Sequence, residues 1–223
     1  MDEIMGLVIL DFDGTLGDTR ANIVLTMRQT LERKGYPVAS EEEIASTIGL
    51  PLEEGFRQLV PGITEHEVIS CALTYRDIFE ANRKLLVPKL FPGVAETLAA
   101  LVSEGYVLTV ASSRSSRSLK GFLADMDIDG YISYVLGADN VFKAKPDPEP
   151  VLKTLSDLGF APEETIVVGD MPVDIIMGKG AGTKTCGVTY GNSCLEDLAA
   201  AGADMIIDSF PELPGVLLKM CSR

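Results

Sequence analysis

The sequence predicts an α/β fold, namely a doubly wound, Rossmann-like parallel sheet with an all-helical cap domain inserted into it. From residue 93 onward, short apolar runs alternate with amphipathic helical segments, which is typical of parallel sheets covered by helices on both faces. Between residues 20 and 86 only helical patterns occur, directly after the first apolar run. We therefore expect an α/β core of residues 1–18 and 87–223 and a helical cap domain of residues 19–86.

The first predicted strand, residues 7–10, is a short apolar run that ends in two aspartates one residue apart, Asp11 and Asp13. Residues i and i+2 of an extended chain project to the same side, so these carboxylates can converge on one point. Ordinary turn chemistry also favours Asp and Gly after a strand. An ionised carboxylate at the edge of a core is costly unless it is paired or bound to a metal, so the pair indicates a site.

The next segment contains helical signals only. Residues 20–34 place Ile23, Met27 and Leu31 on one face, and Gly35 ends this helix. Three more helices are expected, with these signals: a capping box at Ser40 and Glu43, Pro51 in the first turn of a helix that reaches residue 60, and a capping box at Thr64 and Glu67 for a helix to about residue 84.

Beyond residue 93 the predicted elements alternate. Strands are expected at residues 106–111, 132–136, 165–168, 185–188 and 203–207. Helices are expected at residues 93–104, 115–125, 148–158, 172–181 and 193–201, followed by a final helix after residue 209. The expected caps of the later helices are Asp147, Ser193 with Glu196, and Ser209 with Glu212.

Composition narrows the class of protein. The 223 residues suffice for one domain with an insertion, and a net charge of −14 disfavours nucleic-acid binding. The four cysteines show no Cys-x-x-Cys spacing and are expected to be free thiols in a reducing compartment. His66 is the one histidine, too few for a histidine metal cluster. No signal peptide or membrane span is indicated, so we expect a cytoplasmic protein without a membrane partner.

Polar residues that could carry chemistry follow the predicted strands. In doubly wound sheets the ligand site lies beyond the carboxyl ends of the strands. Taken singly, these residues have ordinary explanations as helix caps or solvated side chains. Their arrival at one edge of one sheet predicts a functional site there. They are Asp11 and Asp13 after the first strand, Ser112, Ser113 and Arg114 after the second, Lys145 after the third, and Asp170 and Asp174 after the fourth.

Charge then indicates the ligand. Two unit charges about 4 Å apart repel by roughly 4 kcal/mol at an effective dielectric of 20, so the four aspartates need a cation. Carboxylate and carbonyl oxygens without His or Cys favour a hard ion, and Mg²⁺ is the expected one. A divalent cation with Lys145, a serine hydroxyl and loop amides forms a phosphate site. One carboxylate can attack the phosphoryl group while a second transfers protons.

These residues resemble the motifs of the haloacid dehalogenase superfamily. Residues 11–16, Asp-Phe-Asp-Gly-Thr-Leu, resemble its first motif, Ser112 its second, Lys145-Pro146 its third, and residues 169–174 its fourth. The resemblance implies that Asp11 is the nucleophile and Asp13 the general acid and base. It also implies Mg²⁺ held by Asp11, the Asp13 backbone carbonyl and Asp170, with Asp174 as a further acidic ligand or a partner of the ligands. Ser112 and Lys145 would hold the phosphoryl group, and neighbouring Ser113 is a further candidate.

The branch of the superfamily follows from resemblance as well. Asp13 is absent from the dehalogenases, and residues 48–52 lack the lysine of the phosphonoacetaldehyde hydrolases. Ile23 stands near the place of a histidine in the β-phosphoglucomutases, which disfavours mutase activity. Residues 49–52 and 145–148 look most like the phosphoglycolate-phosphatase-like group, which also includes pyrophosphatases and nucleotidases.

The expected function is Mg²⁺-dependent hydrolysis of a small phosphorylated metabolite, phosphoglycolate-like, through an aspartyl-phosphate. The alternatives are a phosphomutase of the β-phosphoglucomutase type, a pyrophosphatase or nucleotidase, and a non-catalytic phosphate-sensing protein. The protein is expected to be a monomer or homodimer. Four cations of the helical segment could meet a substrate carboxylate, although solvated positions suit them equally: Arg20, Arg57, Arg76 and Lys84.

Overall fold

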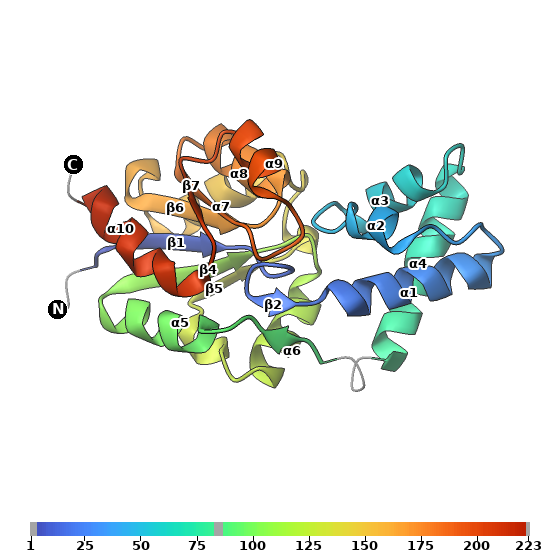
Figure 1. Cartoon of the computed structure of the whole chain (residues 1–223), viewed down its shortest axis with the longest axis horizontal. Coiled ribbons are helices and arrows are strands. Elements are labelled where there is room, and N and C mark those ends of the chain that lie inside the picture. The colour runs from blue at the N-terminus through green and yellow to red at the C-terminus, as the bar shows by residue number, and fades with distance from the viewer. Residues whose placement is uncertain (1–3, 83–86, 222–223) are drawn as a thin grey trace.

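A six-stranded parallel sheet forms the centre of the computed structural model, which describes residues 4–82 and 87–221 (Figure 1). The strand order is β5-β4-β1-β6-β7-β8, and every neighbouring pair is parallel. The doubly wound α/β class is thereby confirmed. The strand bounds are β1 Gly6–Leu10, β4 Tyr106–Ala111, β5 Tyr134–Leu136, β6 Thr165–Gly169, β7 Lys184–Val188 and β8 Met205–Ile207.

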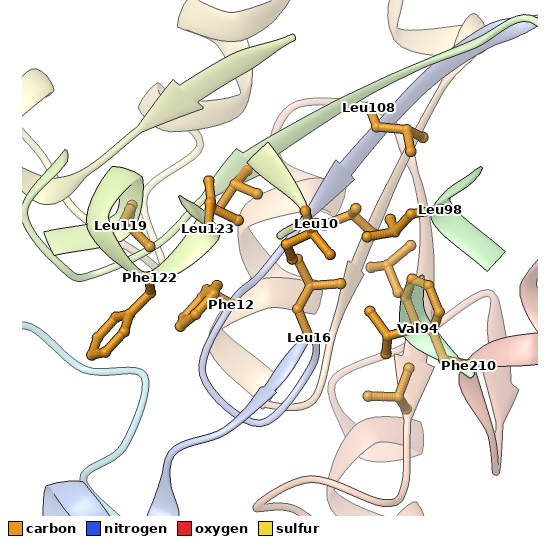
Figure 2. Close-up of a cluster of buried hydrophobic side chains, with 14 of the residues drawn as sticks. Leu10, Phe12, Leu16, Val94, Leu98, Leu108, Leu119, Phe122, Leu123 and Phe210 are labelled. Atoms are coloured by element: carbon orange, nitrogen blue, oxygen red, sulfur yellow. The ribbon is translucent and has the colours of Figure 1, made fainter. Parts of the chain in front are cut away.

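Alternate residues of β1 pack on opposite faces of the sheet. The helices of this part of the chain are α5 Val94–Ser103, α6 Ser116–Asp125, α7 Glu149–Leu158, α8 Pro172–Gly180, α9 Leu195–Ala200 and α10 Leu213–Cys221. Leu7 and Ile9 belong to a core with α7 and α8, whereas Val8 and Leu10 belong to a core with α5, α6 and α10. Figure 2 shows the second core, in which Phe12 and Phe122 stack with ring centroids 5.7 Å apart. A strand buried on both faces explains the continuous apolar run in the sequence.

Four short connecting turns are 3₁₀-helical in the described residues: η1 Asp129–Tyr131, η2 Ala138–Asn140, η3 Pro162–Glu164 and η4 Phe210–Glu212. The sequence analysis did not separate these turns from the longer elements. The last of them lies between Ser209 and α10, and the Ser209 hydroxyl donates to the Glu212 carboxylate at 3.0 Å. The expected cap residues are thus paired, but they close a turn in front of α10.

Residues 20–82 form helices beyond the carboxyl end of the sheet, at the right of Figure 1. Their bounds are α1 Arg20–Lys34, α2 Glu41–Ala45, α3 Leu52–Leu59 and α4 Glu65–Asn82. A two-stranded antiparallel ribbon of β2 Gly17–Asp18 and β3 Lys89–Leu90 connects them to the sheet. The sequence did not predict this ribbon, because two-residue strands carry no alternating pattern. Residues 83–86, where the fourth helix was expected to end, lie outside the described residues.

The capping predictions have mixed outcomes. The box at Ser40 and Glu43 is confirmed in both directions, as is that at Thr64 and Glu67. The prediction for Ser193 is wrong: α9 begins after Cys194. The Ser193 hydroxyl lies 2.9 Å from the Met171 sulfur instead.

The N-terminus of α7 differs by one residue from its prediction. Pro148 occupies the cap position, although the Asp147 carboxylate still accepts from the Glu149 N–H at 3.0 Å. Three of the cysteines, Cys71, Cys186 and Cys194, are free thiols. Among the described residues we find no helix with the length and apolar character needed to traverse a bilayer.

Candidate active site

The loop after β1 brings Asp11 and Asp13 to the carboxyl edge of the sheet. The Asp11 N–H still donates to the Val168 carbonyl at 2.9 Å, so the loop leaves the sheet beside β6. Gly14 then adopts a φ of 89°, and a Cβ there would lie 2.1 Å from Oδ2 of Asp170. A glycine is required at this point because only its bare backbone approaches Asp170 so closely.

Three buried carboxylates surround one lysine at this edge. Lys145 Nζ donates to Oδ1 of Asp11 at 2.5 Å and to Oδ1 of Asp174 at 2.6 Å. Asp11, Asp170 and Asp174 each present an oxygen within 4.8 Å of the others, and all are at most 5 % exposed. One ammonium cannot neutralise three carboxylates, and the donor set is all oxygen. The site therefore fits a hard divalent cation.

Three hydrogen bonds and one close backbone approach orient Asp170, and they come from two loops. The Thr15 hydroxyl donates to its Oδ1 at 3.2 Å. The backbone N–H and the side-chain amide of Asn192 donate to Oδ2 at 2.7 and 2.9 Å. A Cβ on Gly191 would lie 2.4 Å from Asp170, so the Asn192 loop also needs a glycine to approach. The carboxylate is thus held rigidly in place before any cation binds.

Burial shapes the protonation of this cluster. Burial and then the charge of Asp174 raise the pKa of Asp170 to about 7, against the Asn192 hydrogen bonds. Burial raises the pKa of Asp11 well above its usual value, and the neighbouring carboxylates add to this effect while Lys145 opposes it. Burial favours the neutral amine of Lys145, but Asp11 and Asp174 outweigh it and raise its pKa. Loss of the proton from Asp11 or Asp170 is therefore disfavoured without a cation, and a bound cation would favour the deprotonated carboxylates.

The side chain of Asp13 lies apart from this cluster and binds Arg114. Arg114 Nε donates to the two carboxylate oxygens at 2.8 and 2.7 Å, and Nη2 lies 2.7 Å from Oδ1. The two side chains are 12 % and 9 % exposed. Asp13 was predicted as a metal residue. Its carboxylate is engaged elsewhere, which leaves its backbone carbonyl as the candidate ligand.

The guanidinium of Arg114 packs against two aromatic rings. Its carbon lies 5.1 Å from the Phe79 ring centroid in α4 and 5.0 Å from that of Phe122 in α6. Tyr75 stacks on the other side of Phe79, with centroids 6.2 Å apart. The two ring centroids are 5.8 Å apart and the ring planes are inclined by 86°, so the rings lie on adjacent sides of the guanidinium and do not enclose it.

The two serines after β4 have different contacts. Ser112 is buried, and its hydroxyl accepts from the Arg114 N–H at 3.3 Å. Because β4 is the neighbour of β1, Ser112 lies at the same sheet edge as Asp11. The Ser113 hydroxyl donates instead to the carbonyl of Gly49, between α2 and α3, at 2.6 Å. In this arrangement Ser113 joins the helical segment to the sheet domain.

The sequence analysis missed two residues on the loop after β7. Asn192 orients Asp170, and the Tyr190 hydroxyl donates to the Thr15 carbonyl at 2.9 Å. The Tyr190 ring also packs on Phe91 beside β3, with centroids 4.7 Å apart. The signal was available, because this loop also follows a predicted parallel strand. Applying the strand-end rule to β7 would have found it.

The cations of the helical segment lie in exposed pairs. Arg57 is 2.7 Å from Glu65, Arg76 is 2.7 Å from Glu53, and Arg20 is 3.8 Å from Glu41. Their side chains are 39 % exposed or more. These contacts match the solvated alternative for the three arginines. Lys84 lies outside the described residues.

Comparison with known proteins finds similar sequences over most of the chain. Residues 8–188 match the family model described as haloacid dehalogenase-like hydrolase. The chain is 40 % identical to a protein named "Probable phosphatase IndB" from Dickeya dadantii, covering 97 % of this chain and 96 % of that protein. It is 32 % identical to the pyrophosphatase PpaX of Anoxybacillus flavithermus, with 94 % and 95 % covered, and 30 % identical to a phosphoglycolate phosphatase of Photorhabdus laumondii, with 92 % and 89 % covered.

The fold has close counterparts among solved structures. A predicted phosphatase from Clostridium acetobutylicum superposes with a TM-score of 0.88 at 25 % identity, covering 97 % of this chain and 100 % of that one. A predicted phosphoglycolate phosphatase from Haemophilus somnus superposes with a TM-score of 0.83 at 27 % identity, covering 95 % and 97 %. The similarity therefore extends over the sheet and the inserted helices together.

The substitution Asn192→Ala tests the orienting role of the amide. It removes one of the two bonds from residue 192 to Asp170 and leaves the backbone bond. We expect the dissociation constant for Mg²⁺ to rise about 10-fold, because partners of metal ligands typically contribute this much. Calorimetric titration measures it, with Asn82→Ala in α4 as the control. An unchanged constant in Asn192→Ala would remove the proposed role.

The raised pKa of Asp170 predicts a pH-dependent stability in the metal-free protein. Between about pH 4 and pH 7 the folded state keeps a proton that unfolded Asp has lost, so the free energy of unfolding falls as pH rises. Urea unfolding in EDTA at pH 5 and pH 7.5 should show a loss of roughly 2 kcal/mol that Asp170→Asn lacks. Excess Mg²⁺ should reverse the trend, since it binds the deprotonated carboxylates. Equal slopes in the two proteins would contradict the assignment.

Proposed function

Because the chain belongs to the haloacid dehalogenase-like hydrolase family, we propose that it is a Mg²⁺-dependent phosphatase that hydrolyses a small phosphorylated metabolite through an aspartyl-phosphate on Asp11. The observation that carries this proposal is the buried group of Asp11, Asp170 and Asp174 around Lys145 at the carboxyl edge of the sheet. Relatives named phosphatase and phosphoglycolate phosphatase support the reaction class.

The chain supplies several oxygen ligands for the cation. Asp11, Asp170 and the Asp13 backbone carbonyl would hold it, with Asp174 as a further ligand or as a partner of the ligands. The all-oxygen set with no histidine or sulfur favours Mg²⁺ over softer ions. When bound, the cation supplies charge neutralisation between the nucleophile and the phosphoryl oxygens.

The proposed reaction has two steps. Asp11 attacks phosphorus while the bond from phosphorus to the ester oxygen breaks, and Asp13 gives its proton to the departing oxygen. A water molecule then attacks the aspartyl-phosphate, with Asp13 accepting the proton of that water, and phosphate leaves Asp11 regenerated. Lys145 and Ser112 would hold phosphoryl oxygens, since both lie at the edge where Asp11 lies.

The site needs an opening for substrate. Asp11, Asp13, Ser112, Lys145, Asp170 and Asp174 are each at most 7 % exposed. We propose that residues 19–86 are a cap domain on a core of residues 1–18 and 87–223, and that the ribbon of β2 and β3 carries its movement. Ser113 with Gly49, and Arg114 with Phe79, are the contacts that closure would form. Closure then excludes water from the reacting groups.

Two alternative activities within the family, pyrophosphatase and phosphomutase, can be distinguished by experiment. A pyrophosphatase is favoured by the similarity to the pyrophosphatase PpaX, and a phosphomutase is disfavoured by Ile23 in α1. A panel of phosphoglycolate, pyrophosphate, nucleoside monophosphates and glucose 1-phosphate, with Mg²⁺ or with EDTA, separates them. Isomer without free phosphate would identify a mutase. No Mg²⁺-dependent turnover of any compound would favour the non-catalytic alternative.

Removal of the nucleophile should abolish turnover. Asp11→Asn replaces the attacking carboxylate with an amide, and we expect phosphate release to fall at least about 10⁴-fold. The measurement is phosphate release from p-nitrophenyl phosphate at saturating Mg²⁺. Asp197→Asn on the exposed face of α9 serves as the control. Activity that persists in a pure Asp11→Asn preparation would refute the aspartyl-phosphate.

Removal of the proton donor should slow both steps. For Asp13→Asn we expect kcat to fall about 10²- to 10³-fold. The first turnover should suffer less with p-nitrophenyl phosphate, because nitrophenolate leaves without a proton. Stopped-flow absorbance should therefore show a burst close to one product per site before slow turnover. A wild-type rate in Asp13→Asn would exclude the acid–base role.

A further inference from the structure

Arg114 is a buried cation with a fixed position at the junction of the helical segment and the sheet. Phe79 of α4 and Phe122 of α6 pack against its guanidinium on adjacent sides. Its backbone is also held, because the Arg114 carbonyl accepts from the Ala138 N–H at 2.8 Å. The helical segment and the sheet domain thus both contact this guanidinium and fix its position. Its unused donors are the part that can bind a further group.

The edge of the guanidinium is only partly used. Nε donates to Asp13 and Nη2 lies 2.7 Å from its Oδ1, whereas in residues 4–82 and 87–221 we find no acceptor for Nη1. The side chain keeps 12 % of its surface exposed. Because a guanidinium stays charged at every accessible pH, it retains donors for a further anion.

The contact with Asp13 also places Arg114 in relation to the reaction. In the proposed mechanism Asp13 hydrogen-bonds the leaving oxygen, so a group that touches Asp13 lies on the leaving-group side. When Asp13 carries its proton toward that oxygen, it no longer balances the charge of Arg114. A buried charge that loses its partner is strongly unfavourable unless another anion replaces it.

From these contacts we propose that Arg114 determines substrate specificity by binding a second anionic group of the substrate, on the leaving-group side of the transferred phosphoryl group. This inference rests on the proposed phosphatase function and names its substrate class: acidic phosphate esters or diphosphates. Phosphoglycolate and pyrophosphate both carry such a group, a carboxylate in one and a second phosphoryl group in the other.

The other cations considered from the sequence have different contacts. Lys145 is held by Asp11 and Asp174 on the nucleophile side. The arginines of the helical segment that were considered from the sequence, Arg20, Arg57 and Arg76, form exposed pairs with glutamates. Of these five cations, Arg114 is the one that contacts Asp13.

The experiment compares matched ligands that differ in the second charge. Calorimetry measures the dissociation constants of 2-phosphoglycolate and 2-hydroxyethyl phosphate, and of pyrophosphate and methyl phosphate, with Mg²⁺ in the full-length Asp11→Asn protein, which does not turn them over. With Arg114 present, at least one charged ligand should bind about 30-fold more tightly than its neutral partner. The pair that shows the preference identifies a carboxylate or a phosphoryl group as the second anion.

Variants at residue 114 then test the source of this preference. Arg114→Met should reduce the ratio to within about 3-fold of unity, and Arg114→Lys should give an intermediate ratio, since lysine keeps the charge but loses the planar fork. Arg76→Met, a matched change at an exposed arginine, should keep the wild-type ratio. If Arg114→Met unfolds, the intermediate ratio of Arg114→Lys still tests the proposal.

The outcomes separate the two proposals. Equal binding of both members of each pair, or a preference that survives at Arg114→Met or is undiminished at Arg114→Lys, would overturn the role of Arg114. Because binding is measured without turnover, this result holds whether or not the wild-type protein hydrolyses the compounds. Absence of hydrolysis would count against the phosphatase function, and a lost preference at residue 114 would still support the anion site.

Discussion

Three carboxylates, Asp11, Asp170 and Asp174, share a buried volume with the single ammonium group of Lys145. Burial of this group opposes folding, because one ammonium cannot balance three carboxylates in a region of low dielectric. The chain tolerates it because Lys145 pairs with Asp11 and Asp174, while Thr15 and Asn192 donate to Asp170. The charged groups at this edge thus lower the stability of the fold, and burial of the apolar core must offset that loss.

The parallel sheet makes this crowding of charged side chains possible. Strands β4, β1 and β6 are neighbours, so their carboxyl ends deliver Ser112, Asp11 and Asp170 to the same edge. Leu7 and Ile9 pack toward one layer of helices, and Val8 and Leu10 toward the other. Because β1 packs on both faces, a shift of one residue along the strand would displace all of its apolar side chains. This packing fixes the position of Asp11.

The parts predicted from the sequence are those that local patterns determine. Apolar runs and caps predicted the strands and most helices, and carboxylates after strands predicted the Asp11–Asp170–Asp174 cluster. The Asp13–Arg114 pair joins residues 101 positions apart, and nothing in either segment specifies that contact. The prediction for Ser193 failed because its hydroxyl lies against Met171 after the chain folds. Tertiary contacts of this kind leave no periodic signal, and the contact of Ser113 with Gly49 was hidden for the same reason.

Lys145 and Arg114 occupy the two sides of the site, and the difference between their side chains suits the difference between their tasks. An ammonium is a compact charge that can serve two carboxylates at once, as Lys145 does with Asp11 and Asp174. A guanidinium carries its donors in a planar fork, so aromatic rings can pack beside it while donors remain for an anion, as at Arg114. One of those rings, Phe79, belongs to α4 in the helical segment. The geometry of the leaving-group side therefore depends on the position of that segment, whereas the nucleophile side is built from the sheet domain alone.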